Sequence, residues 1–303
     1  MLTLDEKKIR KGKPIGLPYQ GSKKKVSKKI VEIIKQNFGT DKPIYDIFGG
    51  GGAIAAECLI NGLDVHYNDL DETVTSMFQK VVSEDRDYLK TLIVSRDEFL
   101  KIREKENKTV DDELKLLINS FGNNRKNYLY SKETSDVKYN LAVEIIEKYD
   151  AFDGYRKTDA YLGAKDVFKD HAYQKTQQDK MNRLQQLQQL QQLERLQQLE
   201  CVEVTNMDYT EFSEVEGAIL YLDPPYENTT LNGYSIDGFN SQSFYDWAYE
   251  MSKKNIVLIS SYEISDERFK CVYEFKNARN TFSSKSCRGI ESEKLFMVKK
   301  GEE

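Results

Sequence analysis

The sequence between residues 44 and 67 constrains the fold more than any other part of the chain. Two largely apolar runs of strand character, 44–47 and 63–67, are separated by the glycines 49–52 and by a segment of helical composition, 53–61. Glycines between a strand and a helix let the backbone approach a bound ligand closely. A strand, a glycine-rich turn, a helix and a second strand predict the start of a doubly wound α/β sheet that binds a nucleotide.

Length and composition limit the class of protein. The 303 residues can hold one large α/β domain or a core that carries a sizeable insertion. With 39% hydrophobic and 31% charged residues, the chain has the composition of a globular protein. No apolar stretch approaches the ~20 residues that span a bilayer, and residues 1–10 lack the apolar centre of a signal peptide. We therefore expect a cytoplasmic protein without a membrane partner.

Cysteine and histidine are too few and too scattered to predict a metal site. The four cysteines include no CxxC pair, and the chain has two histidines. This usage is typical of incidental thiols in a reducing cytoplasm. We expect neither a metal centre nor a disulfide framework.

The net charge of −5 conceals an asymmetry along the chain. Residues 1–36 contain eleven Lys or Arg against three Asp or Glu, so the basic charge gathers at the N-terminus. Such a stretch can contact a phosphate backbone. From charge alone, a solvated helix face is the simpler interpretation.

The chain divides into three zones. Residues 1–80 read as the first, cofactor-binding half of an α/β domain, and 201–303 read as its second half, with strands at 218–222, 256–260 and 295–298. Residues 81–200 between them are more polar and less regular. The pattern predicts a sheet that a mainly helical insertion interrupts.

The insertion ends in a repeat of leucine and glutamine. Its leucines recur every three residues, at 184, 187, 190, 193, 196 and 199. On an α-helix a step of three residues turns 300°, so these leucines circle the helix instead of forming one stripe. We expect a helical linker. A non-α coil of period three is an alternative conformation, and the array could have arisen by slippage in a repetitive coding sequence. A coiled-coil site for a partner is a weaker alternative, because heptad spacing is absent.

The tetrapeptide Asp223-Pro224-Pro225-Tyr226 follows the apolar run 218–222. Proline lacks an N–H donor and has a fixed φ, so the pair stiffens the turn and leaves a carbonyl pointing outward. A carboxylate, a carbonyl and an aromatic face together suit the exocyclic amine of a nucleobase. Alone, the motif could also be a rigid turn with an aspartate cap.

The glycine turn and the second strand suggest how a cofactor binds. The turn departs from the dinucleotide pattern GxGxxG, and no P-loop lysine follows it, so we expect it to face a carboxylate or a ribose rather than a pyrophosphate. Asp69 ends the second strand, where an acid can bind both ribose hydroxyls. Asp69 could equally cap the acidic helix that follows, but the glycine turn upstream favours ribose binding.

Five motifs in a fixed order carry a resemblance to a known family. They are PYQGSK (18–23), DIFGGGGA (46–53), YND (67–69), NMDY (206–209) and DPPY (223–226). The chain resembles the class-alpha, Dam-type DNA adenine-N6 methyltransferases, in particular phage-borne members, over about 80 N-terminal and 100 C-terminal residues. The resemblance implies a Rossmann-like methyltransferase sheet with an inserted target-recognition domain and S-adenosylmethionine as the cofactor.

The resemblance also implies roles for individual residues. Tyr19 and Lys23 would contact the cofactor. Asp46, Phe48 and Gly49 would border its methionine and ribose, Asp69 would hold the ribose hydroxyls, and Asp208 would bind its adenine amine. Gly50 stands where family members often carry another residue. Residues 260–263 resemble a segment near the active-site floor, to which we assign no catalytic role.

The implied chemistry centres on Asp223. Its carboxylate and the carbonyl of Pro224 would accept both hydrogens of adenine N6, localise the lone pair and position it for direct methyl transfer. The base must be flipped out of the duplex, with Tyr226 stacking against it. Asp223→Ala should abolish transfer and spare cofactor binding, whereas Tyr226→Ala should weaken base capture more.

The double-stranded DNA partner would be read in the insertion. Arg125 and Lys126 have side chains for guanine edges or phosphates, and Asn124 could read adenine. A solvated surface turn is an equal interpretation of this segment. The enzyme could act alone or beside a cognate restriction nuclease.

Other substrates and one non-enzyme remain as alternatives. Cytosine N4, RNA adenine and protein glutamine are planar amines or amides that related motifs serve, but an insertion of about 120 residues favours DNA. A catalytically silent DNA-binding module would have little reason to keep Asp46, Asp69 and DPPY together.

Overall fold

The computed structural model describes residues 1–19, 21–169, 183–199, 202–227, 239–275 and 292–299. The chain forms two compact units. The first comprises 1–15, 22–75 and 202–303, and the second comprises 16–21 and 76–201. Within the described ranges, no helix is both long enough and apolar enough to cross a membrane.

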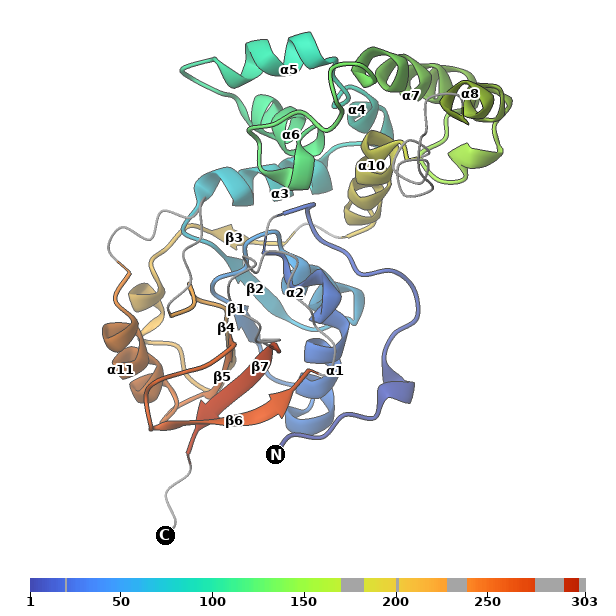
Figure 1. Cartoon of the computed structure of the whole chain (residues 1–303). Coiled ribbons are helices and arrows are strands. Elements are labelled where there is room, and N and C mark those ends of the chain that lie inside the picture. The colour runs from blue at the N-terminus through green and yellow to red at the C-terminus, as the bar shows by residue number, and fades with distance from the viewer. Residues whose placement is uncertain (20, 170–182, 200–201, 228–238, 276–291, 300–303) are drawn as a thin grey trace. The chain divides into compact units, whose positions relative to one another are not determined.

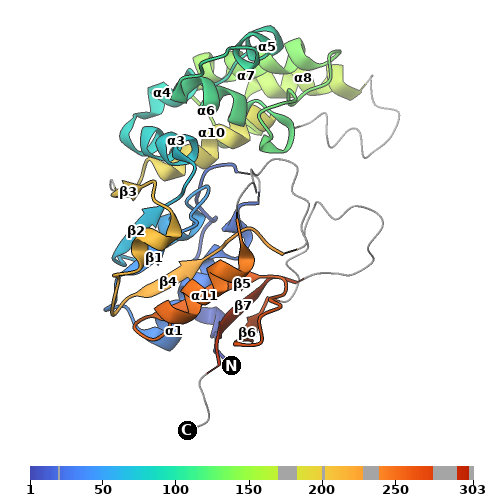
Figure 2. The same ribbon diagram turned by 90° about the vertical axis from the view of Figure 1, so that its left-hand side faces the viewer.

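The first unit is built on one seven-stranded sheet in the order β3-β2-β1-β4-β5-β7-β6 (Figure 2). The strands are β1 (Ile44–Asp46), β2 (Val65–Asn68), β3 (Val204–Thr205), β4 (Ile219–Leu222), β5 (Ile256–Ser261), β6 (Phe269–Glu274) and β7 (Lys294–Val298). The five strands from β3 to β5 pair in parallel, whereas β7 runs antiparallel to both β5 and β6. This arrangement confirms the predicted α/β class.

Helices cover both faces of the sheet, which is why its central strand is apolar throughout. Every residue of β4 is buried. Helix α11 (Ser241–Met251) packs Phe244 and Met251 into the apolar cluster on one face. Helices α1 (Ser27–Phe38) and α2 (Ala53–Ile60) lie on the other side (Figure 1). A parallel sheet covered in this way has near-continuous apolar strands instead of alternating ones.

The parallel strands bring three acidic residues to one edge of the sheet. Asp46 ends β1 and is in register with Tyr67 of β2 and Tyr221 of β4. Asp69 directly follows β2, and Asp223 directly follows β4. In an open parallel sheet, ligands bind outside the carboxyl ends of the strands. The fold therefore gathers these carboxylates where a ligand is expected.

The second unit is mainly helical over its described residues. Its helices are α3 (Glu72–Ser83, which begins in the first unit), α4 (Arg86–Lys90), α5 (Arg96–Arg103), α6 (Val110–Ile118), α7 (Ser135–Tyr149), α8 (Asp159–Lys169) and α10 (Gln185–Leu196). Local signals set several boundaries. Ser95 caps α5, and Thr109 with Asp112 forms a capping box at the start of α6.

The leucine and glutamine repeat forms α10, a helix of the core of this unit. Leu184, Leu187, Leu190, Leu193 and Leu196 are fully buried although they circle the helix. Gln186 is also fully buried, and its amide nitrogen donates to the carbonyl of Val94 and to the side-chain oxygen of Asn119. A helix surrounded by neighbours can bury leucines on most of its circumference, so the three-residue spacing is compatible with an ordinary α-helix.

The burial of α10 predicts a large loss of stability when one of its leucines is truncated. Leu190→Ala removes a fully buried side chain, so we expect the free energy of unfolding to fall by about 2–5 kcal/mol in a urea titration. Gln198→Ala, at an exposed position of the same repeat, is the control and should change stability by less than about 0.5 kcal/mol. Equal stability of the two variants would contradict a core role for the repeat.

Candidate active site

Four side chains of the first unit meet at the carboxyl edge of β4. The ammonium of Lys23 lies 2.8 Å from Oδ1 of Asp223, 2.5 Å from the hydroxyl of Tyr226 and 3.5 Å from Oε1 of Glu293. The Tyr226 hydroxyl in turn lies 3.0 Å from Asp223 Oδ1 and 2.5 Å from Glu293 Oε1. One cation and one hydroxyl thus link two carboxylates, and each of these side chains is largely buried.

Each member of this cluster is positioned by a local feature of its own segment. Ser22 caps the short 3-10 helix Lys23–Lys25 through the N–H of Lys24, which sets the backbone from which Lys23 extends. Asp223 and Tyr226 flank the two prolines after β4, where the fixed φ of proline limits the path of the chain. The ring of Tyr226 also packs edge to face against Tyr262, with centroids 4.8 Å apart.

The buried charges perturb each other. The pKa of Asp223 is raised to about 6, chiefly by burial; the Lys23 ammonium opposes this rise and the nearby Glu293 carboxylate adds to it. Burial lowers the pKa of Lys23, but the carboxylates of Asp223 and Glu293 outweigh this effect and leave its pKa above the ordinary value. Lys23 therefore stays charged, and Asp223 is ionised at neutral pH.

Asp46 holds a second buried carboxylate at the same edge. Its Oδ2 accepts a hydrogen bond from the backbone N–H of Ala55 at 3.1 Å. Its Oδ1 is buried and accepts no hydrogen bond from the described residues. The pKa of Asp46 is raised to about 8, chiefly by burial and also by the charges of Asp223 and Asp69, against the effect of the Ala55 N–H. An unpartnered buried acceptor of this kind is costly unless a ligand supplies a donor.

Asp69 is fixed at the end of β2 by the backbone around it. Its Oδ2 accepts from the N–H of Gly50 at 2.7 Å, and its Oδ1 accepts from the N–H of Asp71 at 2.9 Å. Burial raises the pKa of Asp69, and these two hydrogen bonds act in the opposite direction. Asp69 therefore joins the glycine loop to the turn before α3, whereas the first N–H groups of that helix are met by Asp71, whose Oδ1 accepts from Thr73. Ribose binding by Asp69 stays a prediction.

The glycine loop packs closely on β2. The N–H of Gly49 donates to the carbonyl of Asn68 at 2.9 Å, and the hydroxyl of Tyr67 donates to the carbonyl of Gly50 at 2.6 Å. A side chain at position 49 would meet the Tyr67 ring at 2.4 Å. Position 49 therefore needs glycine for the approach of two backbone segments, whereas Gly50 and Gly52 adopt positive φ.

Other predicted cofactor contacts have clear local roles. Phe48 packs against the apolar cluster of the first unit, with its ring centroid 5.7 Å from that of Phe244. Asp208 is exposed, and its Oδ1 caps a 3-10 turn through the N–H and hydroxyl of Thr210. Tyr19 is half-buried in the segment 16–21 of the second unit.

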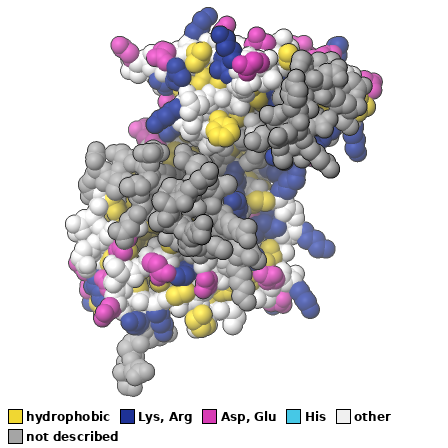
Figure 3. Space-filling view, viewed as in Figure 1, with side chains coloured by type: hydrophobic (Ala, Val, Ile, Leu, Met, Phe, Trp, Pro, Cys, Tyr) yellow, Lys and Arg dark blue, Asp and Glu magenta, His cyan; other side chains and the backbone are white. Residues whose placement is uncertain are grey.

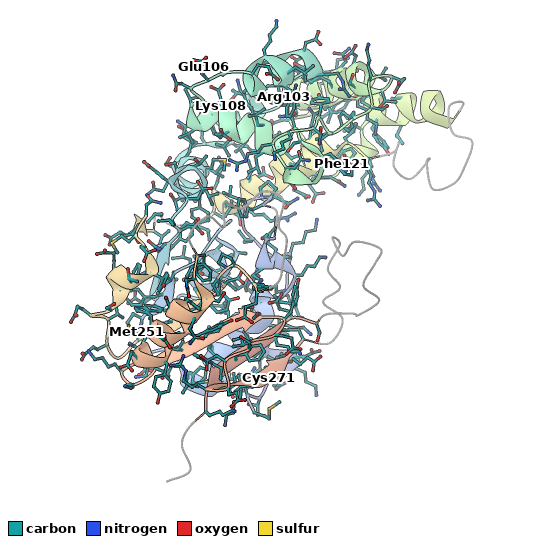
Figure 4. All side chains as sticks on the ribbon, turned by 60° about the vertical axis from the view of Figure 1, so that its left-hand side comes forward. Arg103, Glu106, Lys108, Phe121, Met251 and Cys271 are labelled. Carbon is teal, nitrogen blue, oxygen red and sulfur yellow. The ribbon has the colours of Figure 1, made fainter. Side chains whose placement is uncertain are left out.

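The predicted DNA-reading residues lie in a turn of the second unit. Asn124 accepts from the N–H groups of Lys126 and Asn127, and Arg125 is 3.0 Å from a carboxylate oxygen of Glu113. Lys126 is exposed. Basic and acidic side chains are interspersed on the visible face of this unit (Figure 3). The exposed ring of Phe121 stands at the start of the turn (Figure 4).

The sequence interpretation did not identify Glu293 or the structural role of Asn68. Asn68 is buried. Its side-chain nitrogen Nδ2 donates to the carbonyls of Ile47 and Met207, and its Oδ1 accepts from the N–H of Met207. The turn pattern YND pointed to the position but not to this function. Glu293 carries no local signal, since it lies 67 residues beyond Tyr226 and belongs to none of the motifs. Among the described residues, no cluster of His, Cys, Asp and Glu could hold a metal ion.

Comparison with known proteins identifies one family. A family model described as D12 class N6 adenine-specific DNA methyltransferase matches residues 19–288. No curated protein matches the sequence. Among solved structures, the rRNA methyltransferase aviRa from Streptomyces viridochromogenes aligns over 90% of this chain and 84% of its own, with 10% identity and a TM-score of 0.36. This structural likeness is too low to carry an argument.

The packing of the glycine loop predicts the effect of adding one methyl group. In Gly49→Ala the new Cβ would collide with the buried Tyr67 ring, so the loop must shift. We expect a loss of about 1–3 kcal/mol in the free energy of unfolding. Gly163→Ala is the matched control, because nothing lies within 4 Å of a Cβ there and alanine favours the helix. A Gly49→Ala protein as stable as the control would refute the close approach.

Proposed function

We propose how this chain, which belongs to the D12 class N6 adenine-specific DNA methyltransferase family, performs the reaction of that family. The chain is an enzyme that methylates adenine at N6 in DNA. The observation that carries the proposed mechanism is the position of the Asp223 carboxylate, which lies at the sheet edge together with Asp46, whose Oδ1 has no partner among the described residues. We assign Asp223 to the target amine and Asp46 with Asp69 to the cofactor.

The acidic residues at the ends of β1 and β2 fit S-adenosylmethionine. This cofactor supplies a sulfonium methyl group as the electrophile and carries an ammonium and two ribose hydroxyls. The free Oδ1 of Asp46 would accept from the ammonium, which replaces the missing partner of a buried carboxylate. Asp69, already oriented by the N–H of Gly50, would accept from the ribose hydroxyls. Phe48, Gly49, Tyr19, Lys23 and Asp208 remain proposed neighbours of the cofactor.

Asp223 and Pro224 would receive the target amine. The carboxylate of Asp223 and the carbonyl of Pro224 would accept the two N6 hydrogens, which localises the nitrogen lone pair that attacks the methyl group. In the structure the Asp223 carboxylate pairs with the Lys23 ammonium at 2.8 Å, so the amine must share this acceptor with Lys23 or displace it. A stacked base cannot reach a buried carboxylate, so the adenine would be flipped out and would stack against Tyr226.

Double-stranded DNA is the proposed partner, and the insertion is its proposed reader. Lys126 is exposed and suits a phosphate or a guanine edge. Arg125 would have to leave Glu113, and Asn124 would have to leave its turn, before either could reach a base. We therefore rank Lys126 first among the three. A cognate restriction nuclease remains a proposed companion, and the enzyme could equally act alone.

The identity of the methylated base provides the direct test. We expect labelled S-adenosylmethionine and unmethylated genomic DNA to yield N6-methyladenine after nucleoside digestion. Asp223→Ala should reduce the rate by at least about 100-fold, because it removes an acceptor that acts on the reacting nitrogen, and it should bind the cofactor with wild-type affinity within a factor of about three. Label in N4-methylcytosine would change the base and keep the mechanism. Label in RNA or protein, with none in DNA, would overturn the DNA substrate.

The raised pKa of Asp46 predicts that cofactor binding depends on pH. Below its pKa of about 8, Asp46 carries a proton in the free protein, and this proton must leave before the carboxylate can pair with an ammonium. Affinity should therefore rise from pH 6 toward pH 8, by up to about tenfold per pH unit, and fall again above pH 8 as the cofactor's α-amino group, with an ordinary pKa of about 8, loses its charge. Calorimetry in two buffers of different ionisation enthalpy would count the released proton. Asp46→Asn should bind more weakly and without this rise in affinity, and an affinity constant across the range would refute the assignment.

A further inference from the structure

Glu293 lies at the centre of the hydrogen bonds around Asp223, although it belongs to no motif and follows the residues that the family model matches. Its side chain is buried, with 7% of the residue exposed. Its Oε1 accepts from the hydroxyl of Ser260 at 2.8 Å and from the hydroxyl of Tyr226 at 2.5 Å, and the Lys23 ammonium is 3.5 Å away. Three donors thus converge on one carboxylate oxygen.

The direction of β7 explains why Glu293 reaches this place. Glu293 immediately precedes β7, and β7 runs antiparallel to β5, with Lys294 opposite Ser261 and Leu295 opposite Ser260. A strand that runs opposite to its neighbours begins at the edge of the sheet where those neighbours end. Glu293 therefore enters the sheet beside the carboxyl end of β5, which supplies Ser260.

The number of hydrogens in the cluster makes the two carboxylates compete. The Tyr226 hydroxyl has one hydrogen and two carboxylates within reach, Glu293 Oε1 at 2.5 Å and Asp223 Oδ1 at 3.0 Å. The shorter contact identifies Glu293 as the acceptor of this hydrogen. The ammonium of Lys23 is likewise shared between Asp223 at 2.8 Å and Glu293 at 3.5 Å.

We propose that Glu293 is a positioning residue for methyl transfer, which binds the Tyr226 hydroxyl and shares the Lys23 charge so that the Asp223 carboxylate can accept the target amine. This inference rests on the proposed function of Asp223. Without the Glu293 charge, Tyr226 and Lys23 would both turn to Asp223, and the amine would have to displace two donors from one oxygen. Substrate capture and the rate of transfer would fall together.

The charges around Asp223 give this role a signature that packing alone would not produce. The groups that face Asp223 are Lys23, Glu293, Tyr226, Tyr221 and Asp46. Burial is the largest cause of the raised pKa of Asp223. The Lys23 ammonium lowers this pKa, and the Glu293 carboxylate raises it. Removal of the Glu293 charge must therefore lower the pKa of Asp223 and shift the acid limb of the rate profile toward lower pH.

Glu293→Gln tests the proposal, because it keeps the size of the side chain and removes its charge. We expect kcat to fall about tenfold or more at pH 8 and KM for DNA to rise, while S-adenosylmethionine binds as in the wild type within a factor of about two. The acid limb of kcat should move down by about one pH unit. Glu293→Asp, which restores the charge, should return the limb to its wild-type position. Glu250→Gln, which removes an exposed carboxylate paired with Lys253, is the control and should change none of these quantities.

A carbon-13 titration of the Asp223 carboxyl, assigned with Asp223→Asn, reports the same coupling without any turnover. A downward shift of its pKa in Glu293→Gln, together with the kinetic changes, supports the proposal. Wild-type kinetics in Glu293→Gln would overturn the role of Glu293. So would a slower Glu293→Gln enzyme in which neither the acid limb of kcat nor the pKa of the Asp223 carboxyl moves. Both results leave the proposed function intact. A wild-type protein that binds S-adenosylmethionine but methylates no adenine in DNA overturns the proposed function and this inference with it.

Discussion

The sharing of one buried ammonium between two buried carboxylates is the interaction on which the rest of the site depends. Lys23 neutralises only part of the charge of Asp223 and Glu293, and a buried carboxylate without a partner is strongly destabilising. Burial raises the pKa of Asp223, the Lys23 ammonium lowers it, and the excess negative charge at Glu293 raises it again. The same excess prepares the site for ligands that bring hydrogen-bond donors or positive charge. Both an exocyclic amine and a cationic cofactor meet that description.

The sheet supplies the geometry in which this charge is concentrated. Strands β1, β2 and β4 end at one edge, and β7 begins there because it runs in the opposite direction. Asn68 holds the glycine loop to the segment that follows β3 through hydrogen bonds to Ile47 and Met207. Backbone pairing between strands stops at the last residues of the sheet. Beyond them, the buried side chain of Asn68 provides hydrogen bonds in its place. These hydrogen bonds fix the loops after β1 and β3 at the edge where the acidic residues gather, and a site for group transfer requires such support.

The second unit shows how a repetitive segment can build an ordinary core. In α10 the leucines circle the helix, and the unit surrounds the helix closely enough to bury all of them from 184 to 196. The glutamines between them are half-buried, apart from Gln186, which is buried and bonded to Val94 and Asn119. Because a buried amide must find partners, Gln186 ties the helix to the segment before α5 and to the end of α6. The composition of the repeat is simple, but its neighbours give each position a different environment.

The sequence by itself determined the features that depend on neighbouring residues. Apolar runs, the glycine turn and the acids that follow them predicted β1, α2, β2 and β4, with Asp46, Asp69 and Asp223 at the edge of the sheet, because strand ends and turns are encoded locally. The DPPY and glycine-loop motifs also identified the family. The sequence did not reveal β6, the burial of α10, the place of Glu293 or the partner of Lys23. These features depend on contacts between segments that lie far apart in the chain, such as Lys23 with Tyr226 across 203 positions, and no local periodicity records them. Only the tertiary structure decided them, because the direction of β7 and the burial of charge select which distant side chains meet.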